Sequence, residues 1–199
     1  IYCSLILALS PGIDHIPLPL NTHRMIRLIA FLGNPGTEYR ATRHNVGFML
    51  ADFLYPDASW QMKFHSAYLS LPEWKIIKPM TFMNLSGTAV SEAASFLKLK
   101  SDEILVVHDD TELPLGTARL QKGGGLQGHK GLRSIKERIG SDSFYRLRIG
   151  IGKPRHGDLA LFVTTPFTED ERITLSSLFP LCRKLLSSPE KEGSASVQN

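Results

Sequence analysis

Apolar runs that stop abruptly at polar residues divide this chain. Residues 26–32 (IRLIAFL) are almost wholly apolar, which predicts a strand buried on both faces of a sheet. The run ends at residues 33–36 (GNPG), all of which are strong turn formers. A later run, residues 104–107 (ILVV), ends in the same way at the polar tripeptide 108–110 (HDD). Because ligands bind beyond the carboxyl ends of strands in open α/β sheets, these polar residues are expected to form a site.

Apolar residues at helical spacing separate the strands. The expected helices cover about residues 45–54, 86–97, 129–139 and 169–186. Further strands, apolar or alternating, are expected over about residues 63–71, 73–78, 117–121 and 145–151. Strands and helices therefore alternate along the chain with few hairpins. This order predicts an α/β fold: a single domain with a twisted mixed, mostly parallel β-sheet flanked by helices.

The length and composition fit one globular domain. With 199 residues, 42% of them hydrophobic, the chain can bury one substantial core. We expect a domain over residues 25–186, an extension outside the core fold over 1–24, and a disordered polar tail over 187–199. No apolar run approaches the roughly 20 residues of a membrane span, and residues 1–24 match a cleaved signal peptide poorly. Two cysteines, Cys3 and Cys182, lie in no metal-ligand spacing, so a reducing, cytoplasmic location is expected.

The formal net charge of +4 conceals a strong asymmetry. Between Arg119 and Arg155 two acidic residues oppose ten basic ones, so this segment carries +8 and the remainder −4. Such a concentration of basic charge favours a polyanionic partner such as nucleic acid, although a solvated charged face would have the same composition. The ten basic residues are Arg119, Lys122, Lys130, Arg133, Lys136, Arg138, Arg146, Arg148, Lys153 and Arg155.

The polar residues at the strand ends suggest a hydrolytic site. His44 is the best candidate for a general base, because an imidazole titrates nearest to neutral pH; its alternative role is that of a structural histidine at a helix start. Asp109 could orient that imidazole and stabilise its charged form, or could instead cap a turn. No G-x-S-x-G motif is present, so an activated water is the expected nucleophile. Asn34 and Asn84 could then bind the acyl group and the peptide of a substrate, or could instead be turn and cap residues.

Two other kinds of site fit the sequence less well. The HDD tripeptide 108–110 could bind a metal, but consecutive strand residues point to opposite faces, so at most two would converge. The triple glycine 123–125 is no P-loop, because no Gly-Lys-Ser/Thr follows it. Its backbone N–H groups could still contact a phosphate near the helix that starts at about His129. We therefore predict no metal site.

Five segments together resemble one known family. They are GNPGTEYRATRHNVG, KPMTFMNLSG, VVHDDTELPLG, GGGLQGHKGLRSI and FYRLRIGIG, which occur in this order between residues 33 and 152. In sequence and spacing they resemble the bacterial-type peptidyl-tRNA hydrolases over about residues 25–167. The resemblance implies hydrolysis of the ester bond between peptide and tRNA by a His-activated water, which releases free tRNA for translation. It also implies a metal-independent, usually monomeric enzyme without a cofactor, whose partner is peptidyl-tRNA.

The resemblance assigns roles to individual residues. His44 resembles the catalytic base and Asp109 the carboxylate that orients it. Asn34 and Asn84 resemble substrate-binding asparagines, and Tyr39 matches a tyrosine at the rim of the site. The predicted tRNA-binding residues belong to the basic segment, where Arg119 and Arg148 match family positions and Lys122 and Arg133 are added from the charge pattern: Arg119, Lys122, Arg133 and Arg148.

One departure from the family pattern leaves alternatives open. The usual His-Asn-Gly before the basic helix is His129-Lys130-Gly131, so Lys130 replaces a substrate-binding asparagine and could add a phosphate contact. An altered site favours the first alternative, a non-catalytic RNA-binding protein of the same fold, like the plant organellar splicing factors that resemble these hydrolases. A peptidase or esterase without nucleic acid is the second alternative, but it leaves the basic segment without a role.

Overall fold

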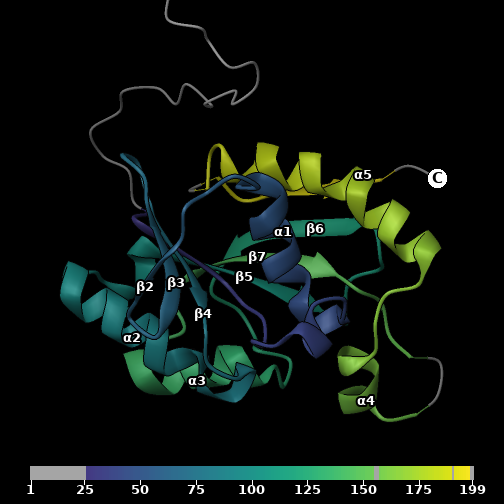
Figure 1. Cartoon of the computed structure of the whole chain (residues 1–199), viewed down its shortest axis with the longest axis horizontal. Coiled ribbons are helices and arrows are strands. Elements are labelled where there is room, and N and C mark those ends of the chain that lie inside the picture. The colour runs from purple at the N-terminus through teal and green to yellow at the C-terminus, as the bar shows by residue number, and fades with distance from the viewer. Residues whose placement is uncertain (1–25, 155–156, 190, 198–199) are drawn as a thin grey trace, which may run out of the picture.

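A computed structural model describes residues 26–154, 157–189 and 191–197 of the chain (Figure 1). The extension predicted over residues 1–24 lies outside these described residues. The helices are α1 (Val46–Leu54), α2 (Ser86–Leu97), α3 (Lys130–Ile139), α4 (Leu159–Thr164) and α5 (Glu169–Leu186). The strands are β1 (Leu28–Phe31), β2 (Gln61–Lys63), β3 (Ser66–Ser70), β4 (Lys75–Pro79), β5 (Ile104–Asp110), β6 (Thr117–Lys122), β7 (Tyr145–Gly150) and β8 (Gly193–Ser196). Short 3-10 turns, η1 (Thr37–Tyr39), η2 (Arg43–Asn45), η3 (Met83–Leu85) and η4 (Ser101–Glu103), join them.

The strands form one mixed sheet in the order β2-β3-β4-β1-β5-β7-β6-β8. The three parallel pairs, β4–β1, β1–β5 and β5–β7, occupy the centre. The four antiparallel pairs lie toward the two edges. The predicted mixed α/β sheet flanked by helices is confirmed, but antiparallel pairs outnumber parallel ones. At one edge short hairpin connections join β2 to β3 and β3 to β4, while at the other edge β6 and β8 pair antiparallel even though α3 lies between β6 and β7 and α5 precedes β8.

Two apolar layers cover the two faces of the sheet. On β1, Ile29 and Phe31 point to one face while Leu28 and Ala30 point to the other, as the two-residue period of a strand requires. Figure 1 shows α1 and α5 on the first face and α2 and α3 on the second. A central strand that is apolar on both faces therefore ends between two helical layers, and the residues after it are held by both.

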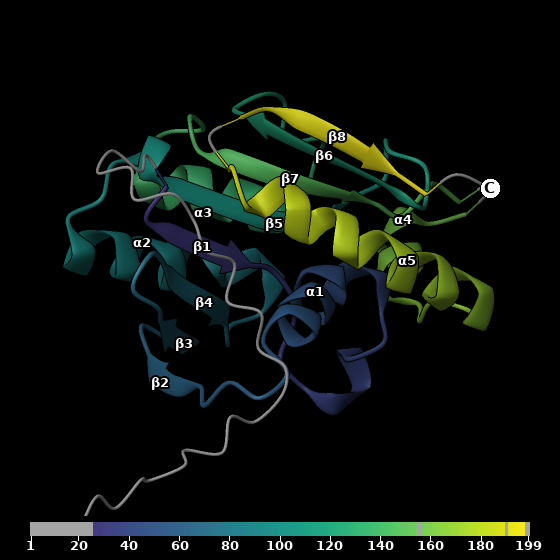
Figure 2. The same ribbon diagram turned by 90° about the horizontal axis from the view of Figure 1, so that it is seen from above.

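A C-terminal strand lies where the sequence predicts a disordered tail. Residues Gly193–Ser196 form β8, which pairs antiparallel with β6 at the edge of the sheet (Figure 2). The prediction of disorder is wrong for these residues. The small polar sequence GSAS has no apolar signature, and its order comes from backbone pairing with β6 and from contacts with α5.

A glycine in α1 sets how closely this helix approaches the centre of the sheet. A Cβ at Gly47 would lie 2.4 Å from the backbone oxygen of Leu32 and 3.0 Å from that of Val107. Leu32 directly follows β1 and Val107 lies in the middle of β5, and a hydrogen bond of 2.9 Å from the Leu32 N–H to the Val107 oxygen joins them. The start of α1 is thus held directly against the end of β1 and the adjacent part of β5.

Replacing Gly47 by alanine tests this close approach. Alanine normally stabilises a helix interior relative to glycine by roughly 0.5–1 kcal/mol, but here its methyl group would collide with backbone. We therefore expect Gly47→Ala to lower the free energy of unfolding by about 1–3 kcal/mol, the usual cost of overpacking. Urea unfolding measures this difference. Ser95→Ala, at an exposed position of α2, is the control and should leave stability unchanged or raised; an equally stable Gly47→Ala would contradict the close approach.

Candidate active site

A cavity of about 570 Å³ opens at the carboxyl end of the parallel strands. Its wall contains all six side chains predicted from the sequence as catalytic or substrate-binding: Asn34, Tyr39, His44, Asn84, Asp109 and Lys130. They come from loops and turns after β1 and β4, from the end of β5 and from the start of α3. The structure therefore brings together residues that lie up to 96 positions apart in the sequence.

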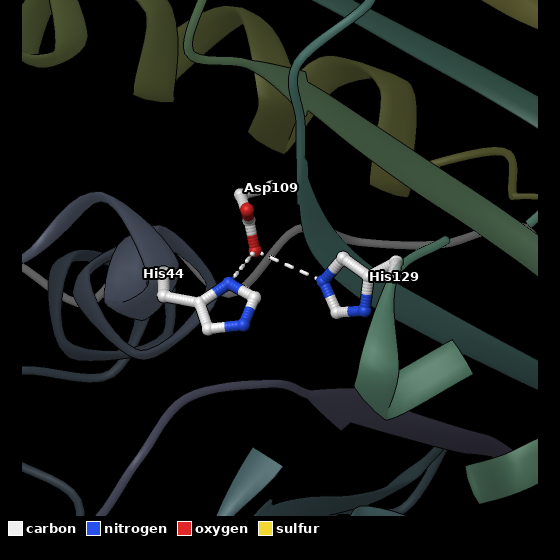
Figure 3. A group of neighbouring side chains, drawn as sticks. All are labelled: His44, Asp109 and His129. Atoms are coloured by element: carbon white, nitrogen blue, oxygen red, sulfur yellow. Dashed lines mark hydrogen bonds and ion pairs between the residues drawn. The ribbon is translucent and has the colours of Figure 1, made fainter. Parts of the chain in front are cut away.

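His44 and Asp109 form a hydrogen-bonded pair at the inner wall of this cavity (Figure 3). The Nδ1 atom of His44 lies 2.8 Å from Oδ1 of Asp109, and both residues are buried. With a proton on Nδ1 donated to the carboxylate, the lone pair of Nε2 is free to accept a proton. His44 belongs to η2, which precedes α1 directly, so the close approach of α1 to the strand ends places the imidazole over the end of β5.

His129 is a third member of this group that the sequence reasoning did not identify as a site residue. Its Nε2 atom lies 3.0 Å from the same oxygen, Oδ1 of Asp109. His129 is the N-cap of α3, and its Nδ1 accepts from the N–H groups of Gly131 (3.1 Å) and Leu132 (3.3 Å). Since Nδ1 accepts, Nε2 must carry the proton and donate it to Asp109. The signal available in the sequence was its place at the predicted helix start, where capping side chains occur.

Asp109 is held as a carboxylate by its two imidazole neighbours. Burial alone would raise the pKa of this group, but His44 and His129 together hold its pKa well below the usual range. The side chain is 2% exposed, so its charge is compensated almost entirely by these hydrogen bonds. A buried carboxylate of this kind can orient a neighbouring imidazole and stabilise its protonated form.

A pair of asparagines fixes the loop after β1. The Asn45 side chain accepts from the N–H of Asn34 and donates to its carbonyl oxygen, each at 2.9 Å. The Asn34 side chain in turn accepts from the N–H of Met83 through Oδ1 at 2.7 Å. This last bond ties η3, which carries Asn84, to the loop after β1. With Oδ1 engaged, the amide nitrogen of Asn34 is the donor left for a ligand in the cavity.

Arg43, next to the candidate base, anchors η2 to the C-terminal part of the chain. Its guanidinium donates to the carbonyl oxygens of Thr165 and Pro166 at 3.1 and 2.9 Å and to both carboxylate oxygens of Glu171 at 2.9 and 2.7 Å. Burial alone would raise the pKa of Glu171. The Thr168 N–H and Arg43 stabilise the charged carboxylate, so its pKa is lowered overall. Arg43 therefore fixes η2, and with it His44, to the segment that follows α4.

The rim of the cavity is more exposed than its inner wall. Asn84 and Lys130 are exposed, and Tyr39 is half-buried with its ring edge-on to Phe82. Within the described residues Lys130 forms no ion pair, so its ammonium group is available to a ligand. Apolar side chains on α4, including Leu159 and Val163, complete the opposite rim. The cavity thus combines polar groups at its inner end with a partly apolar entrance.

The predicted tRNA-binding residues divide into two sets. Arg119 on β6 and Arg148 on β7 are directly opposite each other across the strands and share one face of the sheet. Arg133 is exposed on α3, which covers the same face. Lys122 lies on the other face, because it is opposite Tyr145, whose ring belongs to the core beneath α5. The structure therefore brings Arg119 and Arg148 together and sets Lys122 apart from them.

His108 lies in the cavity wall as a buried neutral imidazole. Its Nδ1 donates to the carbonyl oxygen of Asp109 at 2.7 Å, and its ring packs edge-on against His129. Within the part of the chain that the structure describes, its Nε2 has no hydrogen-bond partner. Burial, followed by the neighbouring His129, lowers the pKa of His108 from 6.5 to about 3. The ring therefore remains neutral at physiological pH.

One group of side chains among the described residues has the composition of a metal site. It consists of His44, Asp109 and His129, whose possible ligand atoms lie within 4.8 Å of one another. Of the HDD tripeptide, only Asp109 belongs to it. In the arrangement observed, both imidazoles are hydrogen-bonded to one carboxylate oxygen of Asp109.

Comparisons with known proteins identify the family of this chain. A sequence model described as peptidyl-tRNA hydrolase matches residues 28–199. The chain belongs to the peptidyl-tRNA hydrolase family. A peptidyl-tRNA hydrolase of Citrifermentans bemidjiense is 42% identical over 174 residues, which cover 84% of this chain and 93% of that protein. One of Sulfurimonas denitrificans is 44% identical over 163 residues, covering 80% and 87%.

Solved structures show the same fold. The crystal structure of the peptidyl-tRNA hydrolase of Acinetobacter baumannii superimposes with a TM-score of 0.76 at 32% identity, covering 85% of this chain and 92% of that one. The resemblance inferred from the five sequence segments is thus confirmed at the level of the family, which places this chain among the hydrolases. No helix in the described ranges is long and apolar enough to cross a membrane.

The buried neutral state of His108 predicts a pH dependence of stability in this peptidyl-tRNA hydrolase family member. In the unfolded chain a histidine binds a proton near pH 6.5, whereas folded His108 does so only near pH 3. The unfolded state therefore binds more protons below pH 6.5, and stability falls on acidification by up to about 1.4 kcal/mol per pH unit.

The measurement is the free energy of unfolding from urea titrations between pH 6.5 and 4.5. Asp109, whose pKa is lowered, adds its own loss of stability only below about pH 4, because the unfolded carboxyl group is ionised above that value. His108→Leu should reduce the dependence of the free energy of unfolding on pH between pH 6.5 and 4.5, whatever its effect on absolute stability. A variant with the wild-type slope would contradict the assignment.

Proposed function

We propose that this protein hydrolyses the ester bond between the peptide and the terminal ribose of peptidyl-tRNA and so releases free tRNA for translation. The observation that carries the proposal is the hydrogen-bonded His44–Asp109 pair in the wall of a cavity that also contains two asparagine side chains. An ester at the end of a nucleic acid requires a small acyl site beside a basic surface. Arg119 and Arg148 supply such a surface on the same chain.

In the proposed reaction His44 acts on water. Its Nε2 removes a proton from a water molecule, and the oxygen of that water forms a bond to the ester carbonyl carbon. Asp109 remains ionised, accepts a hydrogen bond from the Nδ1–H of His44 and stabilises the imidazolium. When the tetrahedral intermediate collapses, the bond to the ribose oxygen breaks, and His44 returns its proton to that oxygen. The products are a peptide with a free carboxyl group and a tRNA with a free terminal hydroxyl.

The asparagines position the peptide and stabilise the negative charge that develops on the carbonyl oxygen. The amide nitrogen of Asn34 is available for this because its oxygen already accepts from Met83. Asn84, exposed on the other side of the cavity, suits the peptide backbone of the substrate. Both lie on turns tied to each other by the Asn34–Met83 bond, so their spacing is fixed before substrate binds.

His129 keeps the base in its correct tautomer by an indirect route. Its N–H occupies one lone pair of Oδ1 of Asp109, and the His44 N–H occupies another. The carboxylate oxygen therefore cannot rotate away from either ring. In this role His129 is a positioning residue, and the proposed chemistry requires neither a metal ion nor a cofactor.

Peptidyl-tRNA is the proposed partner, bound through its acceptor end and its phosphate backbone. Arg119, Arg133 and Arg148 are the side chains proposed to contact phosphates, and we propose that the protein acts as a monomer in the cytoplasm. The alternative of a non-catalytic RNA-binding protein is not favoured; the hydrogen-bonded His44–Asp109 pair and the bonds that fix Asn34 support an enzyme.

Hydrolysis of an N-blocked aminoacyl-tRNA tests the function and its base together. Wild-type protein should release the blocked amino acid and leave unblocked aminoacyl-tRNA intact. His44→Ala should lower kcat by roughly 10²–10⁴-fold, the contribution of a positioned general base. His65→Ala, which removes an exposed histidine paired with Glu92, is the matched control and should retain full activity. Tight tRNA binding by the wild-type protein without hydrolysis of the N-blocked aminoacyl-tRNA would contradict the proposal.

Lys130 provides a second test, directed at the position where this chain departs from the family pattern. Its free ammonium group at the cavity rim is proposed to contact a phosphate near the ester. Lys130→Asn should raise KM about threefold or more at low salt, and the difference should shrink as salt screens the contact. Lys98→Asn carries the same change of charge at an exposed C-cap of α2 and should have no effect. Unchanged constants in Lys130→Asn would reject the phosphate contact.

A further inference from the structure

The side chain of Arg148 is held by two neighbours on adjacent strands. Its Nε donates to Oδ2 of Asp110 at 2.7 Å, and its Nη1 donates to the side-chain oxygen of Gln121 at 2.8 Å. Asp110 lies at the end of β5 and Gln121 on β6, on either side of β7. The Arg148 side chain is 13% exposed and that of Asp110 is 3% exposed. The guanidinium is therefore fixed from both sides and reaches solvent along one remaining edge.

That remaining edge is free for an anion. A guanidinium has five N–H donors, and the two contacts above use one on Nε and one on Nη1. Among the described residues no partner is found for Nη2, and this atom is not enclosed by protein. The exposed Arg119 lies directly opposite on β6. Two like charges directly opposite each other destabilise a sheet, and a shared phosphate would remove that repulsion.

Gln121 also links Arg148 to the glycine loop 123–125, which leads into the cavity wall. Its Nε2 donates to the carbonyl oxygen of Gly123 at 3.1 Å, while its oxygen accepts from Arg148. The buried Arg146 donates to the carbonyl oxygens of Gly123 and Gly125. A Cβ at Gly124 would lie 2.6 Å from Arg146 Nη2 and 2.7 Å from Gln121 Nε2, so the loop passes tightly over both side chains. The loop continues into Leu126–His129 at the cavity.

We propose that Asp110 and Gln121 are positioning residues that set the Arg148 guanidinium to bind a phosphate of the RNA at a fixed distance from the catalytic base. The fixed distance follows from the chain itself, because Asp110 is the residue after Asp109. Asp110 holds Arg148, which is proposed to bind the phosphate, and Asp109 holds His44. The inference rests on the proposed function, since it takes the RNA substrate from there.

The direction in which Asp110→Asn changes RNA affinity distinguishes a positioning role of Asp110 from an effect of its charge alone. Loss of a negative charge beside two arginines should strengthen RNA binding if the field alone mattered. If Asp110 positions Arg148, the same variant should bind more weakly, because the guanidinium loses its fixed orientation. We expect KM for N-blocked aminoacyl-tRNA and Kd for uncharged tRNA to rise roughly three- to tenfold, with kcat unchanged.

The matched control is Asp57→Asn, which makes the same change of net charge in an exposed loop after α1. It should leave Kd unchanged or slightly lower. Gln121→Val is the second variant: it removes the other neighbour without changing charge, and valine suits a strand. It should raise KM and Kd in the same direction. The slope of log K against log salt should fall by about one unit where the Arg148 contact is lost.

The outcomes distinguish this inference from the proposed function. Should Asp110→Asn fail to fold, as judged by thermal unfolding, Gln121→Val decides alone. Binding by either folded variant as tight as that of Asp57→Asn would overturn the positioning role. If wild type binds tRNA and both variants weaken that binding, but no ester is hydrolysed, the inference stands and the proposed function falls. A fall in kcat without a change in KM in Asp110→Asn or Gln121→Val would also contradict the positioning role.

Discussion

The buried carboxylate of Asp109 is the constraint on which the arrangement of the site depends. An ionised group that is 2% exposed is stable only where hydrogen bonds replace its lost hydration, and here two imidazole N–H groups do so at one oxygen. One imidazole belongs to the turn before α1 and the other caps α3, on opposite faces of the sheet. The charge at the end of β5 therefore fixes both helical layers relative to the strand end, and the cavity lies where they meet.

The same logic of replaced hydration explains the polar groups around His44. Arg43 is buried because four oxygen atoms of Thr165, Pro166 and Glu171 surround its guanidinium. Asn34 is buried because Asn45 satisfies its backbone and its own oxygen accepts from Met83. These two polar groups, although removed from water, each hold a segment that carries a proposed catalytic or binding side chain. At Arg43 and Asn34 the hydrogen bonds that replace hydration are also the contacts that fix these segments.

The sequence predicted those features that have a local pattern. The apolar runs located β1 and β5, and the polar residues after them located Asn34 and Asp109. His129 was not found, because its role depends on a carboxylate 20 residues away that only the folded chain brings near. The strand β8 was missed because its order comes from pairing with β6. The placement of Lys122 was available in principle, since a two-residue period puts it on the face opposite Arg119.

The alternation of a β-strand also explains how one chain joins two different chemistries. Asp109 and Asp110 are consecutive, so their side chains leave β5 on opposite faces of the sheet. The first meets two imidazoles that can move a proton, and the second meets an arginine on the basic face. A rigid central strand with parallel neighbours on both sides allows little relative motion between these faces. The step of a single residue therefore sets the separation between the proposed acyl site and the proposed phosphate anchor, which a substrate joining an ester to a polyanion must match.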